Sequence, residues 1–277
     1  MFLLLLLLFT GGDVLPQAGV SIHSDGILKL IVKSSDYRSL PQVPTTIRST
    51  DYRSLPQVPT TIIDTSLAGW GSGVHPTTKL CLNFLASLPP TGINRVCDYG
   101  CGSGVLAISA RKLGLGSKIV FGVDIENDAL DATRTNWDTN FPDSSSLLEL
   151  YHVREVIPGY PLDRVDLLLA NILIGALCRP SMVLTLVNAL RDPDENGENG
   201  GRIVFSGIRP AEKNALFSAY SPYIKFDETL YAELDGSATA GSIDNYKFDV
   251  GNWACCVGRR TASRGTLQSV SSEMAIQ

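Results

Sequence analysis

From Thr65 onward the chain alternates short runs of Val, Ile and Leu with segments of helical periodicity, and this alternation limits the possible folds more than any other feature. Strands separated by helices become parallel neighbours in a sheet that helices cover on both faces. The apolar runs carry almost no polar residues, as doubly covered strands require. We therefore expect an α/β fold with strands at 95–100, 117–124, 147–153, 165–171 and 201–207.

The chain before this region has a different character. Phe2–Phe9 is an apolar run that is too short to span a bilayer and has no basic residue before it, so it fits either a weak targeting segment or a mistaken start of the reading frame. Lys33–Ile47 is followed at once by a near copy, Arg48–Ile62, and each copy holds two prolines and few large apolar residues. Such a composition favours an extended linker.

Three parts follow from these observations. We expect an apolar N-terminal segment with a duplicated, poorly ordered linker, one folded domain, and a disordered tail, at residues 1–62, 63–262 and 263–277. The segment 191–200, RDPDENGENG, is expected to be a solvated loop inside the folded domain.

Charge and cysteine content exclude several classes of protein. The net charge of −5 argues against a nucleic-acid surface, which needs clustered Lys and Arg, and leaves a basic protein open as a partner. The six cysteines form no C-x-x-C pair, so we expect reduced, mostly buried thiols and no metal site. We also expect no stable membrane association and a monomer.

A glycine-rich loop follows the first expected strand in DYGCGSGVLAISA. Gly100, Gly102 and Gly104 let the backbone approach a ligand closely, at the positive end of the helix that begins near Val105. Asp98 would repel a pyrophosphate and suits a cationic or amino-bearing ligand. The alternative is that this carboxylate only caps the loop.

Two further strand ends carry candidate residues. Asp124 lies twenty residues after Gly104 and suits the two hydroxyl donors of a ribose, while Ile125 is suited to pack on a purine face. The alternative is that Asp124 or Asn127 caps the next helix. Asn171 interrupts the apolar run LLLANILIGAL; its amide either satisfies a turn or accepts hydrogen bonds from an amine.

The segment GWGSGVHPTTKLCLNFL, residues 69–85, places glycines and HPTT before an apolar helical face. Pro76 suits a first helical turn, so Thr77 and Thr78 lie where backbone N–H groups lack partners. The segment is either a capped helix after a flexible loop or a loop and helix start that wrap a ligand.

Taken in order, GWGSGVHPTTKLCL, VCDYGCGSGVLAISARKLG, FGVDIENDALDATRTN, VDLLLANILIGAL, GGRIVFSGI and WACCVGRR resemble the ribosomal protein L11 methyltransferase (PrmA) family, from about Ala68 to Arg260. The resemblance implies a Rossmann-like class I methyltransferase fold, a seven-stranded, mostly parallel sheet with helices on both faces. It also implies S-adenosyl-L-methionine as the cofactor.

The resemblance assigns roles to the candidate residues. It implies that the glycine loop closes over the cofactor, that Gly100 lies against the methionine part, that Asp124 binds the ribose hydroxyls, and that Asn171 lies near both cofactor and amine. Together with the motif residues, the predicted cofactor-binding set is Thr78, Asp98, Gly100, Gly102, Asp124, Ile125 and Asn171. Asn171 is also the expected catalytic residue. His75 is a candidate proton acceptor, with a loop-structuring role as the alternative.

These expectations point to methyl transfer from S-adenosyl-L-methionine to lysine side chains of a protein, such as a large-subunit ribosomal protein, in the cytoplasm, a mitochondrion or a plastid. The alternatives are a lysine methyltransferase of the electron-transfer flavoprotein β-subunit type, a small-molecule N-methyltransferase, and a non-catalytic scaffold. The spacing of GCGSG disfavours a dinucleotide-binding dehydrogenase. Residues 1–62 do not resemble the separate N-terminal domain by which bacterial members grip the ribosomal protein, which leaves the substrate less supported than the catalytic domain.

Overall fold

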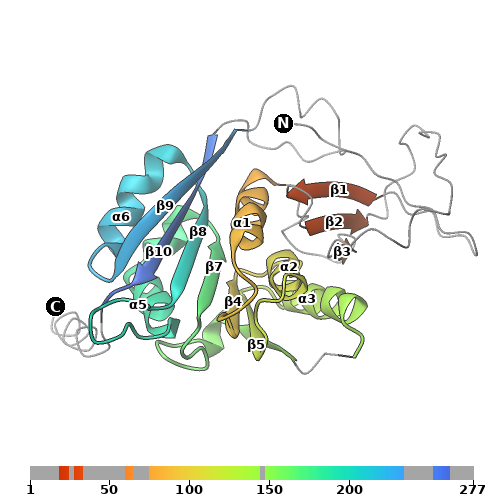
Figure 1. The fold of residues 1–277 in the computed structure, drawn as a ribbon, viewed down its shortest axis with the longest axis horizontal. Helices are drawn as coiled ribbons and strands as arrows, with labels where there is room; N and C mark the ends of the chain where they lie inside the picture. Colours follow the sequence, from red (N-terminus) through yellow and green to blue (C-terminus); the bar gives the residue numbers. More distant parts are fainter. Residues whose placement is uncertain are drawn as a thin grey trace, which may run out of the picture.

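The protein is described from a computed structural model, which describes residues 19–24, 28–33, 60–64, 75–143, 147–233 and 252–262. A seven-stranded sheet runs through the centre (Figure 1). In spatial order its strands are β6 (Leu148–His152), β5 (Ile119–Asp124), β4 (Arg95–Tyr99), β7 (Leu167–Asn171), β8 (Arg202–Ile208), β10 (Asn252–Arg260) and β9 (Ile224–Glu233). The pairs from β6 to β8 are parallel, and β10 runs antiparallel to β8 and β9.

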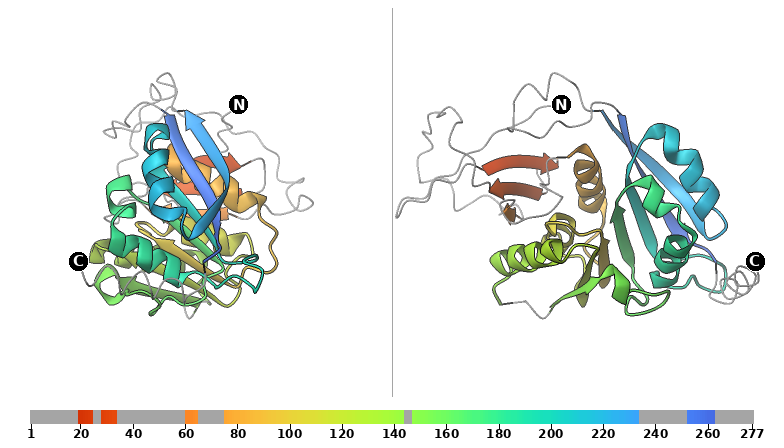
Figure 2. Two further views of the ribbon diagram at one scale, coloured as in Figure 1. Left: turned by 90° about the vertical axis from the view of Figure 1, so that its left-hand side faces the viewer. Right: turned by 180° about the vertical axis from the view of Figure 1, so that it is seen from behind.

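Helices cover both faces of this sheet (Figure 2). One face carries α1 (Pro76–Ser87), α2 (Val105–Lys112) and α3 (Asn127–Asn140), and the other carries α4 (Ile174–Leu177), α5 (Pro180–Ala189) and α6 (Lys213–Tyr220). The short 3-10 turns η2 (Val153–Glu155) and η3 (Pro210–Glu212) follow β6 and β8. Two buried apolar clusters result, one beneath each helical layer.

The observed sheet confirms the predicted fold. All five expected strands are present, and their ends differ from the expected ones by two residues or fewer, because apolar runs bounded by Gly and polar residues mark buried strands clearly. The chain runs from β4 outward to β6 and then crosses back to β7 on the other side of β4. This order makes the gap between the carboxyl ends of β4 and β7 the switch point, where open α/β sheets bind ligands.

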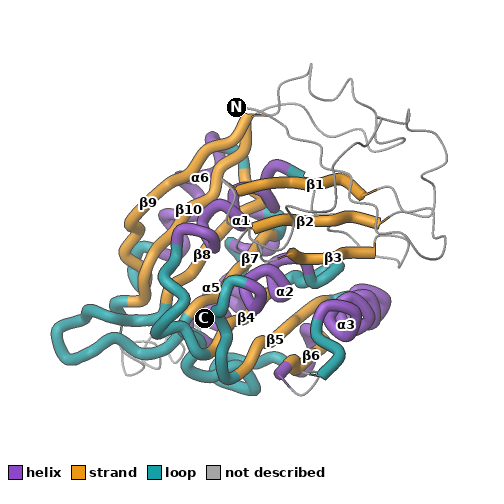
Figure 3. Tube along the Cα trace, turned by 45° about the vertical axis from the view of Figure 1, so that its right-hand side comes forward, coloured by secondary structure: helices purple, strands orange, loops and turns teal. Residues whose placement is uncertain are grey.

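A second, three-stranded sheet lies beside the helices of the first face (Figure 3). It consists of β1 (Gly19–Ser24), β2 (Leu28–Lys33) and β3 (Thr60–Asp64). β1 pairs with β2 in antiparallel fashion, and β2 pairs with β3 in parallel. β3 lies against α2 and α3.

Two asparagines of α3 bind the backbone of β3. The Asn140 side chain accepts from the N–H of Ile62 at 2.9 Å and donates to the carbonyl oxygen of the same residue at 2.6 Å. Asn136 accepts from the N–H of Asp64 at 2.8 Å. The side chain of Ile63 is fully buried. These contacts make β3 part of the folded domain.

The expected domain boundary between residues 62 and 63 therefore falls inside a strand and is wrong at that position. Residues 60–62 belong to the second copy of the repeat, yet they pair with β2 and hydrogen-bond to α3. Residues 19–24 and 28–33 are also strands, so the first 62 residues are not the uniformly irregular segment expected from their composition. The remainder of that segment and the expected tail 263–277 lie outside the described residues.

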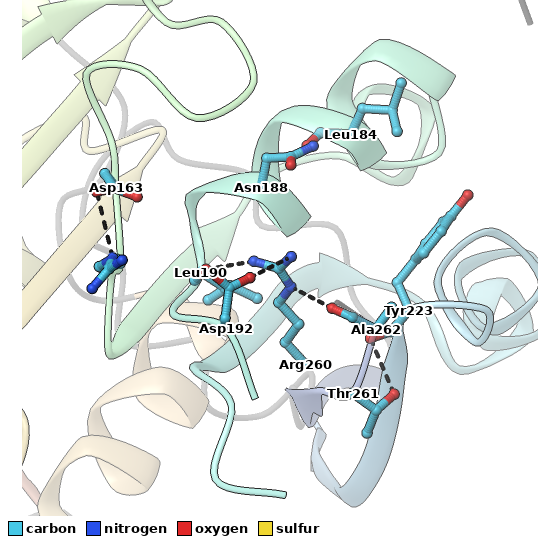
Figure 4. A network of polar contacts seen from close by, with 10 residues as sticks. Asp163, Leu184, Asn188, Leu190, Asp192, Tyr223, Arg260, Thr261 and Ala262 are labelled. Carbon is cyan, nitrogen blue, oxygen red and sulfur yellow. Dashed lines mark hydrogen bonds and ion pairs between the residues drawn. The ribbon is translucent and has the colours of Figure 1, made fainter. Parts of the chain in front are cut away.

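A buried arginine closes the opposite end of the sheet (Figure 4). Arg260, at the end of β10, donates from Nη1 to the Leu190 carbonyl oxygen at 2.8 Å and from Nε to that of Ala262 at 2.9 Å. Its Nη2 lies 2.9 Å from Oδ1 of Asp192 in the solvated 191–200 loop. This guanidinium therefore ties together the end of α5, the loop and the last strand.

No helix in the described part of the chain is long and apolar enough to cross a membrane. The six cysteines are free thiols, and all but the half-buried Cys178 are buried, which agrees with the expectation of reduced and mostly buried cysteines.

Candidate active site

The carboxyl ends of β4, β5, β7 and β8 converge with the start of α1 at one edge of the sheet. All predicted site residues lie at this edge. Residues 65–74, which hold the glycines before α1, lie outside the described residues. The closure of this segment over a ligand therefore stays a prediction.

The loop after β4 is held against the end of β5 by hydrogen bonds. The N–H groups of Gly100 and Cys101 donate to the Val123 carbonyl oxygen at 2.7 and 3.0 Å. The N–H of Gly102 donates to Oδ2 of Asp124 at 2.9 Å. Gly100 and Gly102 have φ of 83° and 54°, a left-handed conformation that other residues adopt at a cost. The glycine loop after β4 and the end of β5 therefore form one hydrogen-bonded unit.

Asp98 is the most unusual group at this edge. Only 1% of the residue is exposed, and Oδ2 accepts from the Ala107 N–H at 3.0 Å. Its Oδ1 has no hydrogen-bond partner among the described residues. Burial raises the pKa of this carboxyl well above its usual range; the hydrogen bond from Ala107 opposes that shift, and the nearby charge of Asp124 adds to it. A buried carboxylate without a cation is costly, so a bound ammonium group would complete this site.

This carboxyl predicts a pH dependence of stability. Because its pKa is raised in the folded state, the folded protein binds this proton more tightly than the unfolded chain does. The stabilisation is full below the ordinary pKa of Asp and is lost as the pH rises through the raised pKa of the folded state. Asp98→Asn cannot titrate, so denaturant unfolding should show the variant gaining stability relative to the wild type as the pH rises. Parallel pH profiles of the two proteins would contradict this assignment.

Asp124 is bound to the local backbone through both of its oxygens. Oδ1 accepts from the N–H groups of Ile125 and Glu126 at 2.8 and 3.1 Å, and Oδ2 accepts from Gly102. Three of the four acceptor sites of the carboxylate are thus used, and Oδ2 of this half-buried group keeps one lone pair for a hydroxyl of a ligand. It therefore has the structural role weighed as the alternative and keeps its capacity for a ligand.

Ile125 follows with 65% of its surface exposed, which is unusual for an isoleucine at the end of a buried strand. An exposed apolar side chain beside a carboxylate oxygen that can accept from a hydroxyl matches the arrangement expected for a nucleoside.

Asn171 and Thr78 meet although 93 residues separate them in the chain. Nδ2 of Asn171 lies 3.5 Å from Oγ1 of Thr78 in the first turn of α1. Thr78 is 2% exposed, whereas Asn171 is half-buried. Oδ1 of Asn171 accepts no hydrogen bond from the described residues, so the amide offers an acceptor at the mouth of the site.

His75 caps α1. Its Nδ1 accepts from the backbone N–H of Thr77 at 3.3 Å and lies 2.7 Å from Oγ1 of the same residue. An accepting Nδ1 places the ring proton on Nε2 in the neutral tautomer. Burial and then the charge of Arg209 lower the pKa of His75. The loop-structuring role therefore fits His75 better than that of a proton acceptor.

Three further residues around α1 were not predicted. Ser206 donates from Oγ to the Thr77 carbonyl oxygen at 3.2 Å, which joins β8 to the start of α1. The Trp253 ring packs edge-on against His75 at 4.8 Å between centroids, and Cζ of Arg209 lies 3.8 Å from the centroid of the Trp253 ring. These residues lie in the sequence stretches WACC (Trp253) and FSGIRP (Ser206 and Arg209). Neither stretch shows which strands become neighbours, so the sequence did not predict that they meet α1.

Within the described residues, no group of three His, Cys, Asp or Glu side chains could hold a metal ion.

The sheet order, the glycine loop after β4 and the carboxylate ending β5 define a class I methyltransferase domain. A family model described as "Ribosomal protein L11 methyltransferase (PrmA)" matches residues 48–234. The chain belongs to this family. The matched range begins before Ala68 and ends before WACCVGRR, so the resemblance of that last stretch lies outside it.

Curated relatives carry the same family name. Ribosomal protein L11 methyltransferases of Shewanella sp. (strain W3-18-1) and Methylobacillus flagellatus are 36% and 38% identical over 172 and 173 residues, which are 62% of this chain. These stretches cover 52% and 51% of the relatives, so the chain spans about half the length of the curated relatives it matches. A crystal structure of a ribosomal protein L11 methylase from Lactobacillus delbrueckii subsp. bulgaricus shares the fold, with a TM-score of 0.58 and 20% identity over 87% of this chain and 99% of that one.

Proposed function

We propose that this chain transfers a methyl group from S-adenosyl-L-methionine to amino groups of a protein, with ribosomal protein L11 as the substrate. The observation that carries the proposal is the buried Oδ1 of Asp98, which has no hydrogen-bond partner among the described residues and lies beside the loop after β4. An ammonium group, such as that of the methionine part of the cofactor, supplies the missing hydrogen bond and the compensating charge.

The remaining edge residues suit the rest of the cofactor. Oδ2 of Asp124 accepts from a ribose hydroxyl, and the exposed Ile125 covers one face of the adenine. Gly100 and Gly102 bring the backbone of the loop close to the methionine part. The bound cofactor supplies a methyl group already activated on a sulfonium, so the protein is left with binding and alignment.

Asn171 aligns the incoming amine. Its Oδ1 accepts an amine N–H while Nδ2 stays near Thr78, and this arrangement turns the nitrogen lone pair toward the methyl group. A lysine is mostly protonated at neutral pH, so it must lose a proton before it attacks. His75 has its Nδ1 engaged, and we assign the proton to water.

A protein substrate is consistent with the family and with the net charge of −5, which attracts a basic partner. The expected compartments, the cytoplasm or an organelle, are those that contain ribosomes. The relatives named for ribosomal protein L11 are about twice as long as the region they share with this chain, so the substrate requires its own test.

The test is incubation of the purified chain with a cell lysate and S-adenosyl-L-methionine carrying a labelled methyl group. Mass spectrometry of the labelled band should identify ribosomal protein L11 modified on amino groups. Label on another protein would overturn the substrate, and absence of label with wild-type protein that binds the cofactor would overturn the transfer activity.

A further inference from the structure

Ile172, the residue after Asn171, is held between the neighbouring strands on either side of β7. β4 lies on one side and β8 on the other; Gly100, directly after β4, and Gly207, within β8, meet this residue. A Cβ added to Gly100 would overlap Cγ2 of Ile172. A Cβ added to Gly207 would lie 2.8 Å from the Ile172 carbonyl oxygen, 3.1 Å from its carbonyl carbon and 3.2 Å from its nitrogen.

Gly207 is a glycine for two reasons. Its φ is 80°, a region that a residue with a Cβ enters only at a cost. The atoms that a side chain would meet belong to the backbone of Ile172 and cannot rotate away. A glycine inside a strand commonly marks such a close backbone approach.

The packing of Ile172 against Gly100 and Gly207 directly affects the adjoining Asn171, the proposed catalytic residue. Asn171 pairs with Ser206, the residue before Gly207, and the Asn171 amide reaches Thr78 only at 3.5 Å. That contact is already at the limit of a hydrogen bond, so Thr78 alone does not fix the amide. The direction of the Asn171 side chain therefore depends on where the adjoining Ile172 backbone lies.

We propose that Gly207, through Ile172, is a positioning residue that sets the Asn171 amide for the acceptor amine. This proposal rests on the proposed function, because it assigns the consequence of the contact to amine alignment. Gly207 lies in β8, and β7 separates β8 from the strand that precedes the glycine loop. A change at Gly207 should consequently act more strongly on turnover than on cofactor binding.

The test compares Gly207→Ala with two matched glycine variants. Gly92→Ala has a similar φ of 86° with nothing within 4 Å of the added Cβ, so it measures the conformational cost alone. Gly258→Ala meets Cγ2 of Ile224 at 2.6 Å and the Lys225 carbonyl oxygen at 2.7 Å, so it measures comparable crowding in a strand remote from the site. Both controls should methylate at the wild-type rate per folded molecule.

For Gly207→Ala we expect kcat to fall by about 100-fold, the order that a misplacement near 1 Å produces, while the Kd for S-adenosyl-L-methionine changes far less. The side-chain amide signals of Asn171 in an NMR spectrum, assigned through Asn171→Ala, should shift in Gly207→Ala and stay in place in Gly258→Ala. A wild-type kcat in Gly207→Ala, or an equal loss in Gly258→Ala, would overturn the proposal.

A second pair of variants covers the case that Gly207→Ala does not fold. Ile172→Val keeps the Cγ2 that lies over Gly100, and Ile172→Leu removes it while keeping the volume. Turnover should drop more in Ile172→Leu than in Ile172→Val. The reverse order would contradict the claim that the packing of Ile172 positions Asn171. If the wild type transfers no methyl group, the proposed function fails, whereas the NMR comparison still decides whether Gly207 positions Asn171.

Discussion

Replacement of Asn171 by alanine is expected to lower the rate of methyl transfer at saturating cofactor by about 100-fold or more, because alignment of the amine acts on the transition state. Stability should change little. The amide makes one contact, at 3.5 Å, among the described residues, and the side chain is half-buried. The measurement is a methylation rate together with a melting curve on the same preparation.

Asn188→Ala is the matched control for this variant. Its amide donates to the Leu184 carbonyl oxygen at 2.9 Å near the end of α5, beside the Arg260 contacts at the opposite end of the sheet (Figure 4). It should leave turnover unchanged. An Asn171→Ala protein that melts lower than the wild type yet methylates at the wild-type rate would remove Asn171 from the catalytic site.

Replacement of Arg260 by methionine should lower the free energy of unfolding by about 2–4 kcal/mol, because the Leu190 and Ala262 carbonyl oxygens lose their donor and each buried acceptor left unpaired costs about 1–3 kcal/mol. The guanidinium is fully buried and binds two carbonyl oxygens as well as Asp192. Methionine fills much of the volume and leaves those oxygens unpaired, and each unpaired buried group adds to the cost. Urea unfolding at constant pH measures the difference.

The neighbouring Arg259→Met provides the comparison. Arg259 pairs with Asp227 at 3.6 Å, and 39% and 33% of the two side chains are exposed. Exposed pairs contribute about 0–1 kcal/mol, so this variant should remain close to the wild type. Equal losses in the two variants would contradict the structural role assigned to Arg260.

The main sheet could be predicted because its signals are local. Val, Ile and Leu runs of strand length alternate with helical patterns between Arg95 and Ile208, and each run needs only its own composition to be recognised. β3 could not be predicted in the same way. Its first three residues end a proline-containing repeat, and its partners on α3, Asn136 and Asn140, lie more than 70 residues away and look like ordinary surface asparagines.

In the candidate site, too, the residues could be predicted from local sequence, whereas the contacts between distant segments could not. Asp98, Asp124 and Asn171 could be chosen because polar residues at the ends of apolar strands are conspicuous. The Oδ1 contacts of Asp124 with Ile125 and Glu126 are local, whereas the Oδ2 contact with Gly102 needed the fold, because it depends on the loop from β4 meeting the end of β5. The packing of Ile172 involves the neighbouring β4, β7 and β8, and the glycine at position 207 in the predicted strand was the one local sequence signal of this close approach.

The central claim is that this edge of the sheet binds S-adenosyl-L-methionine, and calorimetric titration of the purified chain with the cofactor tests it most directly. Wild-type protein should bind at a single site. Asp124→Ala should bind more weakly by about 1–3 kcal/mol, the cost of losing hydrogen bonds to a charged acceptor. Asp128→Ala, on the exposed first turn of α3, should bind as the wild type does. Folded wild-type protein that takes up no cofactor, or an Asp124→Ala protein with undiminished affinity, would contradict the assignment of this edge.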